Sequence, residues 1–154
     1  MSAGTIRNTI WQALEGQKQS IMSDVDIVYY DKKSAKEEEN KIEKELYKID
    51  SNYKWQVKNE YYMNKYNFID QPKFSSLYDA ISHFVETPTC VGAYLDKYDN
   101  IQLIAPYGIK DLMNLNCMPI PLFIKDNNKL YVYKERMLKK KWKNMFPNLT
   151  IYLD

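Results

Sequence analysis

The sequence predicts an α/β to α+β fold in which a mixed sheet is flanked by helices. Helix-like and strand-like segments alternate through the first half of the chain, and two neighbouring strand-like segments in the second half are typical of a hairpin. The chain has 154 residues, of which 45% are hydrophobic, so it can bury one sizeable core. We therefore expect residues 1–154 to form a single domain without internal repeats or a linker.

The first half is expected to hold two helices and two strands. Apolar residues at helical spacing predict a helix over residues 4–14, and an apolar stripe among Lys and Glu predicts a solvent-facing helix over residues 34–49. Residues 25–30 are β-branched and aromatic, which favours a mostly buried strand. Residues 55–59 alternate between apolar and polar side chains, which predicts a second strand, and a helical turn is expected over residues 60–66.

The second half mixes helices with the hairpin. Ser75 or Ser76 can cap the first of these helices, and Pro147 ends the last one. In chain order we expect a helix over residues 77–85, hairpin strands over 90–95 and 101–105, a short helix around Leu112, a long helix over 130–145 and a terminal strand over 150–153.

Composition excludes several classes of protein. The formal charge of +2 neither repels nor strongly recruits a polyanion, so nucleic-acid binding would need local clusters of charge. Cys90 and Cys117 lack the neighbours of a zinc site and are expected to be reduced thiols, and the lone His83 excludes a histidine-based metal site. No apolar stretch approaches about 18 residues and no signal peptide is evident, so we expect a cytoplasmic protein with no membrane partner.

Asp24 and Asp26 form an Asp-x-Asp pair at the start of the first predicted strand. Side chains two apart on a strand share a face and lie roughly 6.5 to 7 Å apart. Two carboxylates at that separation can bracket one or two Mg²⁺ ions, which prefer oxygen ligands and complete their shell with water and substrate phosphates. Taken alone, the pair is weak evidence for a metal site, because Asp-x-Asp occurs by chance in many loops and a solvated strand end is the ordinary interpretation, so other residues must decide.

The segment upstream of the pair favours phosphate binding. Gly4 and Thr5 open the first predicted helix, Arg7 lies on its first turns, and Ser23 directly precedes the aspartates. A helix N-terminus offers N–H groups and partial positive charge, and glycine lets a phosphate approach the backbone. Arg7 could contact a phosphate or pair with an aspartate to hold the site together.

These residues resemble the glycine, arginine and SDxD signature of the polymerase-beta-like nucleotidyltransferase superfamily. The whole chain is similar to a family of small bacterial nucleotidyltransferases. The matching stretches are IRNTIW (6–11), DVDIVYYD (24–31), WQVKN (55–59), ETPTCVG (86–92), APYGIKDL (105–112) and the closing region 136–147. The resemblance implies a nucleotidyltransferase fold and a Mg²⁺-dependent transfer of a nucleoside monophosphate from a nucleoside triphosphate to a hydroxyl acceptor, which would be a small molecule, a protein or RNA. Asp24 and Asp26 would be the metal ligands.

The chain departs from the superfamily pattern on the second predicted strand. The superfamily usually supplies a third carboxylate there, but this strand contains no acid. Glu60 follows the strand directly and could serve as a base or a ligand, Asn59 could ligate through its amide oxygen, and Lys58 could touch a phosphate. The departure leaves open a nucleotide-binding module without turnover.

Two further features shape the expectations. Relatives carry a helix and a strand before the position of Gly4, so we expect this chain to lack those elements. Eight basic residues and several aromatics between residues 125 and 144 are compatible with a nucleic-acid or protein interface. We favour a solvated helix whose aromatics pack inward, so nucleic acid is an alternative partner and not the preferred one.

Overall fold

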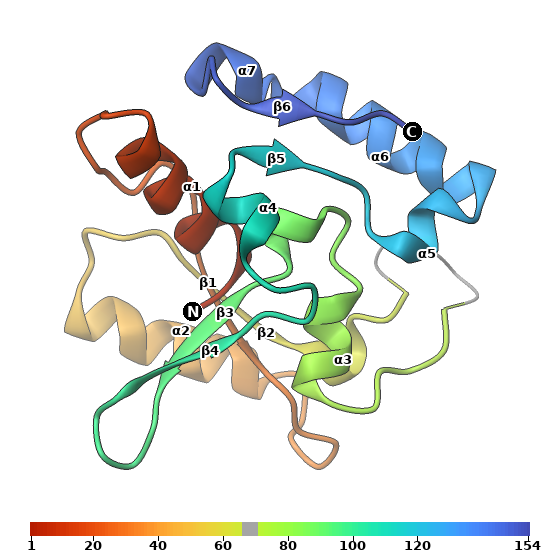
Figure 1. The fold of residues 1–154 in the computed structure, drawn as a ribbon. Coiled ribbons are helices and arrows are strands. Elements are labelled where there is room, and N and C mark those ends of the chain that lie inside the picture. Colours follow the sequence, from red (N-terminus) through yellow and green to blue (C-terminus); the bar gives the residue numbers. More distant parts are fainter. Residues whose placement is uncertain (66–70) are drawn as a thin grey trace.

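The structure is a computed structural model that describes residues 1–65 and 71–154 (Figure 1). Its helices are α1 (Ala3–Leu14), α2 (Glu38–Ile49), α3 (Leu77–Ser82), α4 (Lys110–Met113), α5 (Pro121–Ile124), α6 (Asn127–Lys140) and α7 (Trp142–Met145), with single 3₁₀ turns η1 (Glu60–Tyr62) and η2 (Thr87–Thr89). Its strands are β1 (Val25–Tyr29), β2 (Trp55–Asn59), β3 (Gly92–Leu95), β4 (Ile101–Ile104), β5 (Asn116–Cys117) and β6 (Thr150–Ile151).

The strands make a mixed arrangement, as the sequence predicts. β1 and β2 are parallel, with Asp26 opposite Gln56, whereas β3 and β4 form an antiparallel hairpin. The start of the chain lies between these pairs. The Ser2 N–H donates to the Asp26 carbonyl at 2.9 Å, and the Met1 carbonyl accepts from the Ala93 N–H at 2.9 Å. Residues 1–2 therefore connect β1 to β3, and α1 starts between the two strand pairs (Figure 1).

The main core lies between α1, the segment around α4 and β5, and the C-terminal helices (Figure 1). Trp11 of α1 is fully buried, and its ring makes edge contacts with Trp142 and Phe146. Its indole N–H donates to the Leu112 carbonyl at 3.1 Å, which satisfies its one polar atom. This core fixes α1 and α6 relative to the sheet.

Several elements differ from the sequence expectation. α2 begins at Glu38 rather than at residue 34, and α3 ends at Ser82 rather than at residue 85. The expected long C-terminal helix is broken at Lys141, whose φ of 49° and ψ of 35° are left-handed, so α6 and α7 are separate helices. β5 and α5 are too short to leave a periodic signal and were missed.

Other expectations are confirmed. α1, β1, β2, the hairpin and α4 lie where the sequence places them, and β6 pairs in parallel with β5. Ser76 caps α3, since its Oγ accepts from the Asp79 N–H at 3.1 Å. The turn expected over residues 60–66 is helical only over Glu60–Tyr62, and its last residue lies outside the described part. Cys90 and Cys117 are buried free thiols.

Candidate active site

A cleft of about 400 Å³ lies on the face of β1 and β2 that the start of α1 covers in part. It is walled by α3 on one side and by α6 on another. The residues that line it are Ser2, Ala3, Asp26, Val28, Gln56, Lys58, Glu60, Met63, Phe74, Ala80, His83, Phe84, Val85, Thr89 and Arg136.

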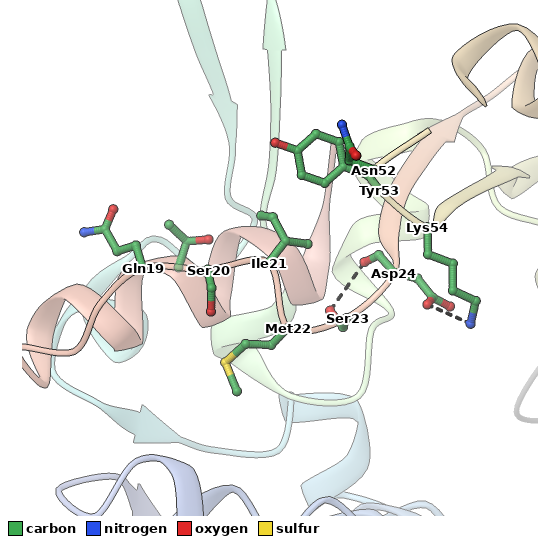
Figure 2. Close-up of a pocket in the computed structure, with 10 residues that line it drawn as sticks. Gln19, Ser20, Ile21, Met22, Ser23, Asp24, Asn52, Tyr53 and Lys54 are labelled. Atoms are coloured by element: carbon green, nitrogen blue, oxygen red, sulfur yellow. Dashed lines mark hydrogen bonds and ion pairs between the residues drawn. The ribbon is translucent and has the colours of Figure 1, made fainter. Parts of the chain in front are cut away.

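The two aspartates lie at the boundary between this cleft and a second hollow. Asp26 lines the cleft, whereas Asp24 lines a hollow of about 630 Å³ formed by residues 19–24 and 52–54, with Thr9 at its wall (Figure 2). There the Asp24 carboxylate pairs with Lys54 at 3.0 Å. Burial and the neighbouring Asp24 carboxylate raise the pKa of Asp26 above its ordinary value. The pair is thus a concentration of negative charge reachable from two sides.

The face of β2 beside Asp26 carries polar side chains of mixed charge. Because Asp26 pairs with Gln56 and Val28 with Lys58, these four side chains share one face, and Glu60 continues it. Glu60 is 5% exposed. Burial, followed by the charges of Asp26 and Glu39, raises its pKa to about 7. Glu60 is therefore a carboxyl group that changes charge near neutral pH.

The N-terminus of α1 adds hydrogen-bond donors at the Asp26 end of the cleft. Ser2 is the N-cap residue but makes no capping bond with its side chain, and its buried Oγ has no hydrogen-bond partner among the described residues. Ala3 follows with a left-handed φ of 49°. A buried hydroxyl without a partner next to a helix N-terminus is a ready site for an anionic oxygen.

Arg7 lies beneath the cleft in a buried network. Its guanidinium contacts Glu86 at 3.4 Å and donates to Thr89 Oγ1 at 2.7 Å, and it stacks 4.0 Å from the Trp142 ring centroid. Arg136, which does line the cleft, binds the same Glu86 carboxylate through Nε at 2.9 Å and Nη2 at 3.0 Å. One carboxylate thus serves two guanidinium groups, and the pair of arginines leaves net positive charge beside the cleft. Arg7 pairs with a glutamate and not with an aspartate.

The structure brings only some of the sequence-predicted residues to the cleft. Asp26, Lys58 and Glu60 line it, and Asp24 and Ser23 line the adjoining hollow. Other predicted residues connect elements. Thr5 Oγ1 donates to the Asp24 carbonyl at 3.2 Å, which ties α1 to the start of β1.

Gly4 and Asn59 also serve packing in the described structure. A Cβ on Gly4 would lie 3.5 Å from Ser23 Oγ, so the glycine faces the loop before β1. Asn59 is fully buried, and its amide binds the backbone of Asp31 and Tyr61. Its oxygen is therefore engaged in shaping the end of β2.

The sequence did not predict most of the residues that line the cleft. Arg136, Thr89 and Glu86 fall in stretches that carry the family resemblance, which was the available signal for them. His83 and Phe74 gave no such signal, because α3 meets the cleft only through tertiary packing. Lys140 belongs to the same cationic side, since burial together with Arg136 and Arg7 lowers its pKa.

The donor chemistry fits Mg²⁺ held jointly by protein and substrate. Asp24 and Asp26 offer carboxylate oxygens, and phosphates and water can complete an octahedral shell. Within residues 1–65 and 71–154, no group of three or more His, Cys, Asp or Glu side chains is arranged to hold a metal ion. Among the described residues, Asp24 and Asp26 would therefore supply the carboxylates, and further ligands would come from a bound nucleotide.

The comparisons with known proteins agree with this geometry. A family model described as nucleotidyltransferase matches residues 1–151. An NMR structure described as revealing a CCA-adding enzyme head domain is 30% identical to this chain, with a TM-score of 0.86, and the match covers 99% of this chain and 80% of that one. No curated protein matches. No helix in the described residues is long and apolar enough to cross a membrane. The match confirms the nucleotidyltransferase fold expected from the sequence, and the chain belongs to the nucleotidyltransferase family.

Proposed function

We propose that this protein is a Mg²⁺-dependent enzyme that transfers a nucleoside monophosphate from a nucleoside triphosphate to an acceptor hydroxyl, which loses its proton as pyrophosphate is released. The observation that carries the proposal is the position of the two aspartates between two hollows, one of which holds a helix N-terminus and cationic side chains. The nucleotide occupies the cleft, and the acceptor approaches Asp24 from the hollow in Figure 2.

The cleft offers one set of residues to the metal ion and another to the phosphates of the nucleotide. Asp24 and Asp26 hold Mg²⁺, which when bound neutralises charge that develops during phosphoryl transfer. Ser2 Oγ donates to a phosphate oxygen, and the guanidinium of Arg136 adds positive charge beside it. Lys58 projects from the strand opposite Val28 and neutralises charge nearer the middle of the cleft.

Glu60 lies beyond Lys58, on the side of the cleft away from Asp24. We assign it to the sugar of the nucleotide, whose hydroxyls can donate to a carboxylate, and not to the acceptor. Glu60→Gln should then reduce the preference for a ribonucleotide over its 2′-deoxy form and raise KM. A role as general base would instead lower kcat and remove a pH dependence near 7.

The test is transfer of label from α-³²P NTPs, with Mg²⁺, to a panel of small hydroxyl compounds, proteins and RNA. RNA belongs in the panel because the matched structure is described as a CCA-adding enzyme head domain and because Lys139 and Lys141, at the end of α6, are exposed. We expect Asp26→Asn to abolish transfer. Labelled product formed as fast by Asp26→Asn as by the wild type would contradict the proposal.

The alternative is a nucleotide-binding module without turnover, which the polar, non-acidic β2 favours. It predicts Mg²⁺-dependent NTP binding with no labelled product for any acceptor, and a change of affinity alone in Asp24→Asn. The same two measurements therefore separate the enzyme from the binding module.

A further inference from the structure

The hairpin of β3 and β4 extends away from the C-terminal helices α6 and α7 (Figure 1). Residues 1–2 lie along the β3 side of the hairpin, where the Ala93 N–H donates to the Met1 carbonyl at 2.9 Å. Among the strands of the described residues, β4 pairs with β3 alone. Within that part of the chain, the outer side of β4 is therefore an open edge of the sheet.

The backbone of β4 presents hydrogen-bonding groups along this edge. Because the Ala93 N–H points to Met1 and away from β4, Ala93 and its partner Leu103 form a non-hydrogen-bonded pair of the hairpin. The pair of Leu95 with Ile101, two residues along, has the same geometry. The N–H and C=O groups of Ile101 and Leu103 therefore point outward from the hairpin, where a further strand can bind them.

The open edge carries exposed apolar side chains. Leu95, Ile101 and Leu103 are 61%, 73% and 57% exposed, and the register places them on one face of the hairpin together with Ala93. Proteins commonly protect an edge strand with charged residues, proline or a β-bulge. Residues 101–105 contain no charge and no proline, and the pairing of β3 with β4 runs in continuous register. The edge is thus suited to pairing with an uncharged, apolar strand.

We propose that the outer edge of β4 is a homodimer interface, in which β4 pairs antiparallel with β4 of a second copy about a two-fold axis at Gln102. In this register the outward groups of Ile101 meet those of Leu103 of the second copy, and the symmetric pair repeats the contact, so that four hydrogen bonds form. The inference goes beyond the proposed function and does not depend on it.

The exposed face of the hairpin favours a second copy over another protein, because it matches itself across the axis. Each row of side chains continues from Ala93 and Leu103 of one copy to Ile101 and Leu95 of the other, so the apolar surface is unbroken over four strands. Neither β3 nor β4 contains a charged residue, so the pairing brings no like charges together.

The interface is small, so the dimer should be weak. At roughly 60 to 120 Å² for each aliphatic side chain that becomes buried, Leu95, Ile101 and Leu103 of both copies account for about 500 Å² of apolar surface. Stable protein interfaces bury about 1,200 to 2,000 Å² in total. We therefore expect a Kd of about 0.1 mM, with a monomer at low micromolar concentration and a largely dimeric protein near 1 mM.

Sedimentation equilibrium of the full chain, from about 5 µM to about 1 mM, measures the association. Leu103→Lys places a charge on the apolar face and should weaken dimerisation at least about tenfold. Ile49→Lys, at an exposed apolar position at the end of α2, is the matched control and should leave dimerisation unchanged. A wild type that stays monomeric throughout, or an Ile49→Lys variant as impaired as Leu103→Lys, overturns the inference.

Cross-linking by oxidised glutathione tests the register. Gln102→Cys places a thiol opposite its own copy in a non-hydrogen-bonded pair, where the Cα atoms are about 4.5 Å apart, within the range that a disulfide spans. The native Cys90 and Cys117 are buried. Gln102→Cys should form a disulfide-linked dimer at least about tenfold faster than Tyr98→Cys, although position 98, at the hairpin tip, is the more exposed. Equal rates, or faster cross-linking of Tyr98→Cys, overturn the proposed pairing.

Discussion

At the scale of single residues, the site depends on where charges are buried. Glu86 is fully buried, and burial alone would raise its pKa. The charges of Arg136 and Arg7 and the hydrogen bonds from Arg136 and Thr89 outweigh burial, so its pKa lies below the ordinary value. The carboxylate is therefore ionised, and it positions both guanidinium groups under the cleft.

Glu86→Gln should destabilise the protein by about 3 to 5 kcal/mol, because it leaves the 4%-exposed Arg7 without its buried counter-charge. Urea unfolding at pH 7 measures the change in the free energy of unfolding. Glu45→Gln is the matched control: it breaks an exposed pair with Lys48 and should cost less than about 1 kcal/mol. Equal small losses in both variants would show that the network does not stabilise the fold.

Glu60→Gln should stabilise the protein at pH 8 by about 2 kcal/mol and change little at pH 5. The folded-state pKa of Glu60 is raised to about 7, so the folded state favours the protonated form. The stability that protonated Glu60 contributes to the fold is fully present below the ordinary pKa of 4.5 and is lost as the pH rises through about 7. Urea unfolding of both proteins without Mg²⁺ at each pH gives the difference. If the free energies of unfolding of the two proteins differed by the same amount at both pH values, the raised pKa of Glu60 would be contradicted.

At the scale of elements, the end of α6 decides how the cationic side of the cleft is presented. α6 supplies Arg136 and Lys140, and the left-handed Lys141 stops the helix and turns the chain into α7. A continuous helix would carry Trp142 away from the ring contact that it makes with Trp11. The break at Lys141 therefore lets one segment of the chain place Arg136 and Lys140 beside the cleft and Trp142 in the core.

Lys141→Gly should stabilise the protein by about 1 kcal/mol, because glycine adopts the left-handed conformation without the steric cost of a Cβ. Lys139→Gly, inside the last turn of α6, should destabilise it by about the same amount. Both substitutions are at exposed positions, and thermal unfolding measures the change in stability of each variant. A loss of stability in both would mean that residue 141 is helical in solution.

At the scale of the whole molecule, the cleft is assembled from elements far apart in sequence. α1, β1, β2, the α3 region and α6 each contribute residues to its lining. A ligand in the cleft contacts all of them at once, so binding should be coupled to global unfolding.

Mg²⁺ with an NTP at about 100 times its Kd should raise Tm by about 5 to 10 °C, as measured by differential scanning fluorimetry. Either component alone should give a smaller shift, because the aspartates need the cation to accept the phosphates. Asp26→Asn should remove the synergy, whereas Asp99→Asn at the exposed hairpin tip should keep it. Identical shifts in both variants would place the nucleotide elsewhere.

The sequence by itself determined the fold class, the family and the aspartate pair. Hydrophobic periodicity fixes α1, β1 and β2, because side-chain burial imposes the helical or strand repeat on neighbouring residues. The motif around Asp24 and Asp26 is likewise local, but β1 begins only at Val25, and the two carboxylates line different hollows.

Only the tertiary structure decided which charged residues reach the cleft. Arg7 and Asn59 looked equivalent to Lys58 as nucleotide contacts, yet the fold buries them in contacts with Glu86 and the Asp31 backbone. Arg136 and His83 enter from helices more than 50 residues beyond Asp26, so no local spacing could pair them with it. Hydrophobic patterning specifies which face of an element is buried, but the partner across a cleft depends on how elements pack.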